Sequence, residues 1–215
     1  LFILIPASVG IILLRSEIVR IILGSGHFGW QQTVTTANVL GLFAISLAAQ
    51  GLVPLFSRAF YALQNTKTPT YISIVSIIIS IILGFILSKS MGIMGLALAF
   101  TIGSITNFGL LYMVLRQQSS IFKSEQSNLL KFVGKVILAT VIMALVIQLS
   151  KNIFGSIVDM QRFWGVTIKT LGSIIIGVSV YIGICHLLKC EEINEVKNIL
   201  VKKFGLNGVG KNGNQ

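Results

Sequence analysis

The feature that most constrains this chain is a set of long apolar segments that contain almost no charge. From Thr70 to Ser88, for example, there is no Asp, Glu, Lys or Arg. A helix needs about 20 such residues to cross the hydrocarbon core of a bilayer, which is about 30 Å thick. Only 11% of the residues are charged and the mean hydropathy is +0.89, whereas soluble domains have about 25% charged residues. The chain is therefore predicted to be an all-α integral membrane protein.

Apolar runs separated by Gly, Pro and charged residues predict six transmembrane helices. These helices are expected at about 1–23, 33–63, 70–88, 93–115, 129–150 and 163–188. Residues 117–128 are expected to form a cytoplasmic loop, and 189–215 a charged cytoplasmic tail. The chain starts with Leu1 rather than Met, without the basic start of a secretory signal. We therefore expect it to be the C-terminal piece of a longer protein.

The distribution of positive charge predicts the topology. Eleven of the 17 Lys and Arg residues fall on one side of the predicted helices, and cytoplasmic loops carry the excess of positive charge in membrane proteins. That side, which includes the C-terminus, is expected to be the cytoplasm. Because topology explains the formal net charge of +11, nucleic acid is not an expected partner.

The sequence contains no pattern of catalytic or metal-binding residues. There is no paired-acid motif, Ser/His/Asp set or phosphate-binding loop. Cys185 and Cys190 lack the CxxC spacing, and His27 and His186 are isolated. Neither an enzyme nor a metal or cofactor site is therefore expected.

The second predicted helix and the turn after it contain several structure-breaking residues. Pro54 removes a backbone donor and frees the carbonyl of Gln50, so a kink and a candidate hinge are expected there. Asn65 is expected to end the helix in the left-handed conformation. Thr68 and Pro69 are expected to be the N-cap and first residue of the next helix.

Small residues recur every four positions on two of the predicted helices. On the fourth helix they are Gly95, Ala99 and Gly103, and on the sixth Ser173 and Gly177. Small side chains at this spacing let another helix approach closely. These residues are therefore expected to be helix-packing positions.

Four polar residues are candidates for binding a lipid headgroup. Arg58 and Lys67 are expected at the depth of the lipid phosphates, and Gln50 and Asn107 are expected to face a cavity. Asn107 is also expected to hydrogen-bond across a helix contact. For Arg58 and Lys67 a simpler interpretation is open. Each cation marks the cytoplasmic side, and its aliphatic side chain extends through the lipid so that the charge reaches the surface.

Ionisable residues inside the predicted helices are rare. Glu17 lies between Arg15 and Arg20, and its spacing of three residues from Arg20 permits an ion pair on the helix. No apolar segment carries a central Asp or Glu. A carboxylate site for a coupling ion is therefore not expected in this part of the protein.

Several motifs resemble the MurJ/MviN family of lipid II flippases. Residues 58–62 (RAFYA) and 66–69 (TKTP) are similar to a family loop that reads FYA, two variable residues and DTKTP. Residues 92–99 (GIMGLALA) are similar to the family's GxxGLALA, and 26–28 (GHF) to its Gly-x-Phe. Asn65 departs from the pattern because it stands where the family has Asp.

This resemblance implies the C-terminal part of a 14-helix MATE-like flippase with two lobes. Residues 1–116 would be four spans of the second lobe. Residues 129–188 would be two extra C-terminal spans that form a groove for a lipid tail, with Lys135 and Lys169 reaching opposite membrane surfaces.

The resemblance also implies a function. The substrate would be lipid II, an undecaprenyl-pyrophosphate-linked precursor of peptidoglycan, moved from the inner to the outer leaflet of the bacterial cytoplasmic (inner) membrane by alternating access. Membrane lipid and cell-wall synthesis proteins are the further partners it suggests.

Two other classes of function stay open. Another polysaccharide-lipid flippase or a multidrug antiporter of the same superfamily has the same fold but as a rule twelve spans. A non-transporting membrane scaffold is the second class. Accumulation of the precursor on the inner leaflet after depletion of the protein would separate these functions from lipid II transport.

Overall fold

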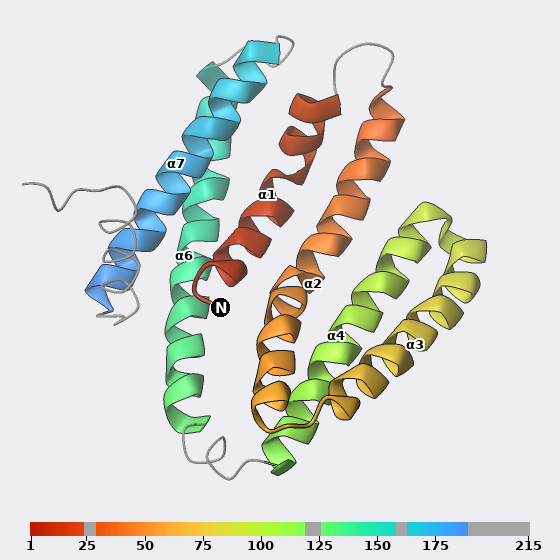
Figure 1. Cartoon of the computed structure of the whole chain (residues 1–215). Coiled ribbons are helices and arrows are strands. Elements are labelled where there is room, and N and C mark those ends of the chain that lie inside the picture. The colour runs from red at the N-terminus through yellow and green to blue at the C-terminus, as the bar shows by residue number, and fades with distance from the viewer. Residues whose placement is uncertain (24–28, 119–125, 158–162, 189–215) are drawn as a thin grey trace, which may run out of the picture.

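All elements of the described structure are α-helices. The computed structural model describes residues 1–23, 29–118, 126–157 and 163–188. Its helices are α1 (Leu4–Leu23), α2 (Trp30–Ala62), α3 (Lys67–Met91), α4 (Ile93–Gln118), α6 (Gln126–Ile157) and α7 (Phe163–Leu187). The six helices predicted from the apolar runs are confirmed (Figure 1).

Five of these helices, α2, α3, α4, α6 and α7, are long and apolar enough to cross a membrane. The sixth, α1, has 20 residues but contains Arg15, Glu17 and Arg20. Large apolar side chains on several helices are exposed, for example those of Ile77 and Ile81 on α3. Such surfaces are unfavourable in water, so this arrangement suits helices surrounded by lipid.

Some helix ends differ from the predicted bounds. α3 begins at Lys67, before the predicted start at Thr70. α4 extends to Gln118 and α6 begins at Gln126, so both helices enter the segment predicted to be a loop. Apolar runs locate helices poorly at their ends, because polar end turns continue the helix beyond the hydrocarbon. The predicted Gly-x-Phe motif and the tail lie outside the described residues.

The helices pack in a row. α3 contacts α4, α4 contacts α2, and α2 contacts α1, whereas α2 and α3 scarcely touch except through their connecting turn. α6 and α7 pack against each other and both contact α1 (Figure 1). α1 therefore lies between the α6–α7 pair and the other three helices.

Two buried clusters hold this row together. Leu14, Ala139, Met143, Ile147, Tyr181 and Cys185 form one cluster, where α1, α6 and α7 meet. Phe56, Phe60, Leu111 and Leu115 form the other, between α2 and α4. The first cluster joins the α6–α7 pair to α1 and the second joins α2 to α4, so the described residues form two cores rather than one central core.

The turn between α2 and α3 has a different geometry from the predicted one. The residue in the left-handed conformation is Gln64, with φ 56°, rather than Asn65. Asn65 instead accepts a hydrogen bond at Oδ1 from the backbone amide of Thr68, at 3.2 Å. The N-cap of α3 is Thr66, so Thr68 lies inside the helix. Pro69 is the third residue of α3 rather than the first. The predictions for Asn65, Thr68 and Pro69 were wrong because the short Asn side chain can cap the following helix as well as end the preceding one.

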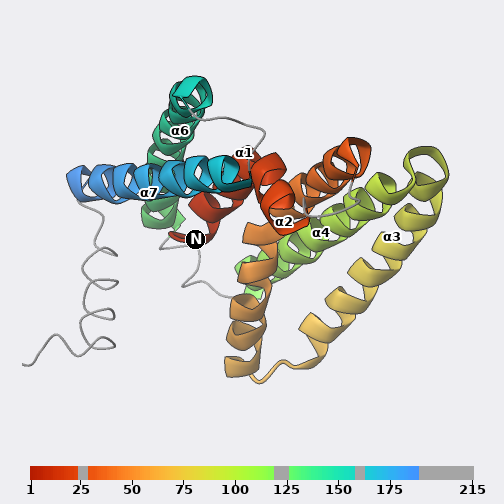
Figure 2. The ribbon, with the colours of Figure 1, turned by 90° about the horizontal axis from the view of Figure 1, so that it is seen from above.

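Helix α2 changes direction between its two halves, as Figure 2 shows. Pro54 lies inside the helix, which continues without a break to Ala62. Near it, the Ser57 hydroxyl donates to the carbonyl of Val53 at 2.9 Å. A helix with an internal proline bends because one backbone hydrogen bond is missing.

Candidate functional site

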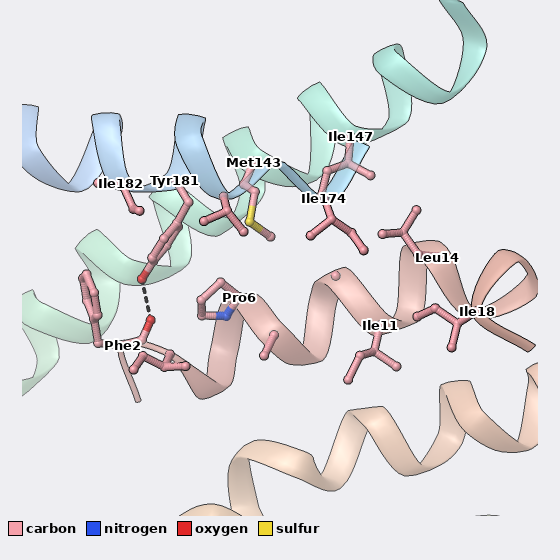
Figure 3. A pocket seen from close by; sticks show the side chains of 14 residues that line it. Phe2, Pro6, Ile11, Leu14, Ile18, Met143, Ile147, Ile174, Tyr181 and Ile182 are labelled. Atoms are coloured by element: carbon pink, nitrogen blue, oxygen red, sulfur yellow. Dashed lines mark hydrogen bonds between the residues drawn. The ribbon is translucent and has the colours of Figure 1, made fainter. Parts of the chain in front are cut away.

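The principal candidate site is an apolar pocket of about 400 Å³ between α1, α6 and α7 (Figure 3). Its lining residues are Phe2, Ile3, Pro6, Ala7, Gly10, Ile11, Leu14, Ile18, Met143, Ile147, Ile174, Val178, Tyr181 and Ile182. On α1 these residues recur every three or four positions and so share one face of the helix. A Cβ at Gly10 would meet no atom within 4 Å. The pocket can therefore accept an apolar chain without forming any hydrogen bond.

A polar link closes one end of this pocket. The Tyr181 hydroxyl of α7 donates to the backbone carbonyl of Phe2 at 2.7 Å, and the two rings lie 5.4 Å apart (Figure 3). The Phe2 carbonyl precedes the first turn of α1. Tyr181 therefore attaches α7 to the start of α1.

A second link joins α1 to α6 near the other end. The Nζ of Lys151 lies 2.7 Å from Oε1 of Glu17, and the two side chains are 18% and 14% exposed. Lys151 also donates to the carbonyl of Leu13 at 2.9 Å, and the Ser16 hydroxyl donates to Glu17 at 2.8 Å. The sequence spacing permits a pair between Glu17 and Arg20; the structure places Lys151 beside Glu17, a residue that this spacing could not identify.

α6 and α7 are closely packed against each other. The Ser150 and Ser173 hydroxyls are 3.3 Å apart, and a Cβ at Gly177 would lie 2.7 Å from the end of the Ile147 side chain. Ser173 and Gly177 therefore occupy the α6–α7 contact, which is the kind of position the sequence assigns to them.

The two lysines expected to reach opposite surfaces behave differently. Lys135 is exposed and donates to the carbonyl of Leu188 at 3.2 Å. Lys169 is only 6% exposed, so its side chain is surrounded by protein, and its reach to the membrane surface stays a prediction. Lys169 lies in the second turn of α7, which is packed against other parts of the protein. Its position near the helix end in the sequence does not reveal this burial.

The small residues of α4 lie against α3. A Cβ at Gly95 would overlap the carbonyl of Leu87, and one at Gly103 would lie 2.7 Å from the Cβ of Ser80. The Ser80 hydroxyl donates to the carbonyl of Ala99 at 3.3 Å. These contacts bring the two backbones close together.

The four candidate headgroup residues do not line the apolar pocket. Arg58 and Lys67 are exposed on either side of the α2–α3 turn. The Gln50 amide, which is half-buried, donates to the Ser46 hydroxyl at 2.7 Å. Oδ1 of Asn107 is buried and accepts no hydrogen bond from the described residues, so the bond predicted for it across the helix contact does not form at this atom. Among the described residues, no group of three or more His, Cys, Asp or Glu side chains could hold a metal ion.

The resemblance implied a tail groove formed by residues 129–188, but the sequence did not predict the wall that α1 contributes to this pocket. Residues of α1 form one wall, and α1 is more than 100 residues away from α6 and α7 along the chain. On α1, apolar residues occur on every face, so their spacing does not distinguish the pocket face from the face that contacts α2. A second hollow of about 280 Å³, lined by residues of α1 and α6 that include Val9, Leu13 and Gln148, was missed for the same reason.

Comparison with known proteins identifies relatives over most of the chain. The family model described as lipid II flippase MurJ matches residues 1–166. A probable lipid II flippase MurJ from Rickettsia prowazekii (strain Madrid E) is 34% identical over 185 residues, which are 86% of this chain and 36% of the relative. A probable lipid II flippase MurJ from Thermotoga maritima is 31% identical over 196 residues, which are 91% of this chain and 37% of the relative.

A solved structure has the same fold. It is described as lipid II flippase MurJ in an inward closed conformation, and it is 26% identical with a TM-score of 0.70. The match covers 89% of this chain and 37% of the solved chain. The chain thus spans little more than a third of the length of these relatives. On the family match over residues 1–166 and the shared helical fold, this chain is a multi-pass membrane protein that belongs to the lipid II flippase MurJ family.

Proposed function

We propose that the protein containing this chain transports lipid II from the inner to the outer leaflet of the bacterial cytoplasmic membrane, as a transporter rather than an enzyme. The observation that carries this proposal is the apolar pocket between α1, α6 and α7. Its volume can hold one segment of a hydrocarbon chain, and its apolar lining suits such a chain better than a sugar or a peptide. α1–α4 are four helices of one lobe in this proposal, and α6–α7 form the groove for the tail.

Lipid access to the pocket supports this role. Ile3 and Ile182 line the pocket and are 66% and 51% exposed. A pocket whose walls continue onto the apolar helix surface can receive a tail sideways from the bilayer. The tail can then remain in an apolar environment throughout transport.

The headgroup needs a different environment. Moving an unpaired pyrophosphate charge through hydrocarbon is prohibitively unfavourable, so cations and amides must surround it. Arg58 and Lys67 supply exposed positive charge where α2 and α3 meet at their connecting turn. Gln50 and Asn107 supply amides, and Oδ1 of Asn107 has an unused acceptor position among the described residues. We assign the headgroup to these four residues together with the lobe that this chain does not include.

Alternating access supplies the movement in this proposal. The bend of α2 at Pro54 serves as the hinge, and the turn at Asn65, Thr68 and Pro69 transmits its movement to α3. The C-terminus and this turn are assigned to the cytoplasm because of the positive charge on that side. Cell-wall synthesis proteins that use the exported precursor are the proposed partners.

Transport can be tested in cells depleted of their own lipid II flippase. An enzyme added outside the cell can cleave only the lipid II that has reached the outer leaflet. Expression of the full-length protein should restore the amount of lipid II that this enzyme cleaves. The competing substrate is a lipid with a different sugar on the same polyprenyl carrier. A pocket that contacts only the tail does not distinguish between these two headgroups. Export of that lipid without export of lipid II would contradict the assignment, and export of neither would favour a scaffold.

A further inference from the structure

The α6–α7 pair is attached to the other described helices only through α1. Cα atoms of α6 and α7 come within 8 Å of α1 and of each other, and within the described residues neither helix comes this close to α2, α3 or α4. Figure 1 shows α1 in this intermediate position. The position of α6–α7 therefore depends on contacts along a single helix.

The α6–α7 pair is itself a close-packed unit. Gly177 lets the Ile147 side chain approach the backbone of α7, and the Ser150–Ser173 hydrogen bond lies inside the same contact. Packing this close resists relative sliding of the two helices. If a link to α1 is lost, the pair should therefore move as one body.

The Glu17–Lys151 ion pair is the principal directional contact between α1 and α6. Nζ of Lys151 contacts α1 at two atoms, Oε1 of Glu17 (2.7 Å) and the carbonyl of Leu13 (2.9 Å). Both charged side chains are mostly buried, where the attraction is much less screened than in water. Ionisable residues are kept in membrane helices where they have a function, and nothing in the headgroup assignment uses this pair.

The ion pair stands at one end of the pocket. Leu14 and Ile18, which line the pocket, lie within one turn of Glu17 on α1, and Ile147 lies one turn before Lys151 on α6. The bond from Tyr181 to Phe2 stands at the other end (Figure 3). The distance between α1 and α6–α7 at these two links sets the width of the pocket between them.

We propose that Glu17 and Lys151 are positioning residues that fix the pocket width and thereby favour lipids with a long polyprenyl tail. The inference rests on the proposed function, because it assigns tail selection to the pocket. Without the ion pair, apolar contacts hold this end of α6–α7, and such contacts have no preferred direction. The pocket then loses its fixed width. A tail long enough to extend from the headgroup residues, which do not line the pocket, into the pocket loses contacts with its wall, whereas a tail too short to enter the pocket loses none.

The first experiment measures the width without transport. Spin labels are placed at Ile22 of α1 and Leu149 of α6, which are both exposed, in the full-length protein. Lys151→Met should broaden the distribution of label distances. The exchange Glu17→Lys with Lys151→Glu should narrow it again, because the pair is restored with reversed charge. Lys89→Met, the same change at an exposed position at the end of α3, should leave it unchanged. An unaltered distribution in Lys151→Met overturns the proposal.

The second experiment measures tail selection by the same variants in liposomes. The substrates carry the lipid II headgroup on either an undecaprenyl or a farnesyl tail. Lys151→Met should lower the undecaprenyl-to-farnesyl ratio of transport rates about tenfold, which corresponds to ~1.4 kcal/mol of lost discrimination. The exchanged pair should restore the ratio, and Lys89→Met should keep it.

Equal losses for both tails would reveal a general effect on folding and would overturn tail selection. Failure of the unaltered protein to transport either lipid contradicts the proposed function instead. The label distances need no transport, so they still confirm or overturn the positioning of α6–α7 by the ion pair.

Discussion

The Thr101 hydroxyl of α4 lies 2.8 Å from the carbonyl of Leu42 on α2, and 2.9 Å from the carbonyl of Ala97 on its own helix. Thr101 is 5% exposed. Its single proton is thus shared between a helix-internal acceptor and one that joins two helices. This bond lies between helices otherwise held by the cluster around Phe56 and Phe60.

Replacing Thr101 with Val should weaken the α2–α4 contact. The change keeps the shape of the side chain and removes the interhelical hydrogen bond, which contributes about 1 kcal/mol in membrane proteins. The free energy of unfolding in detergent should fall by about that amount. Thr106→Val is the matched control, because that hydroxyl bonds only to Ile102 of its own helix among the described residues; equal losses for the two variants would contradict the role of Leu42.

Gly95→Ala should destabilise the α3–α4 hairpin. A Cβ at this position would overlap the backbone carbonyl of Leu87, so the helices must separate, at a cost of about 1–3 kcal/mol. Thermal unfolding of the purified protein in detergent measures the loss. Gly109→Ala on the same helix should have little effect, since its Cβ would meet no atom within 4 Å. Similar melting temperatures for the two variants would show that close approach at Gly95 is unimportant.

Asn65→Ala should destabilise the start of α3. The change removes the acceptor of the 3.2 Å hydrogen bond from the Thr68 amide, and loss of a side-chain hydrogen bond to the first turn of a helix costs about 0.5–2 kcal/mol. Asn65→Asp keeps an acceptor oxygen and should retain most of the stability. Proteolysis rates at the turn or unfolding in detergent can compare the two, and equal damage from both changes would argue against capping by this side chain.

These positions show how far the sequence could be interpreted. Runs such as Thr70 to Ser88 predict helices because the bilayer forces backbone hydrogen bonds to form within each apolar segment. The turn was misassigned because Asn65 can adopt a left-handed conformation or cap a helix, and only the fold decides between these roles. The partner of Glu17 and the pocket depend on how α1, α6 and α7 meet. Spacing within a helix carries no information about such distant contacts.

Arg58→Glu should impair transport more than Lys197→Glu. Arg58 is exposed beside the α2–α3 turn, and a charged hydrogen bond to a phosphate contributes about 1.5–3 kcal/mol. Its reversal should therefore lower the transport rate by about tenfold or more. Lys197 belongs to residues 189–215, which lie outside the described residues, and Arg58→Lys should keep part of the activity. Equal tolerance of the two reversals would reduce Arg58 to a topology signal.

The delivery of lipid II to the outer leaflet by Gly10→Phe protein tests most directly whether the pocket holds the lipid tail. Gly10 lines the pocket, and a side chain there first meets open space, so the ring should fill the pocket while the helices stay in place. Each buried methylene contributes about 0.8 kcal/mol, so excluding two or more of them should slow transport about tenfold. Gly134→Phe, at an exposed and equally open position on α6, should transport at the normal rate. An unchanged rate in folded Gly10→Phe protein would contradict a tail in this pocket.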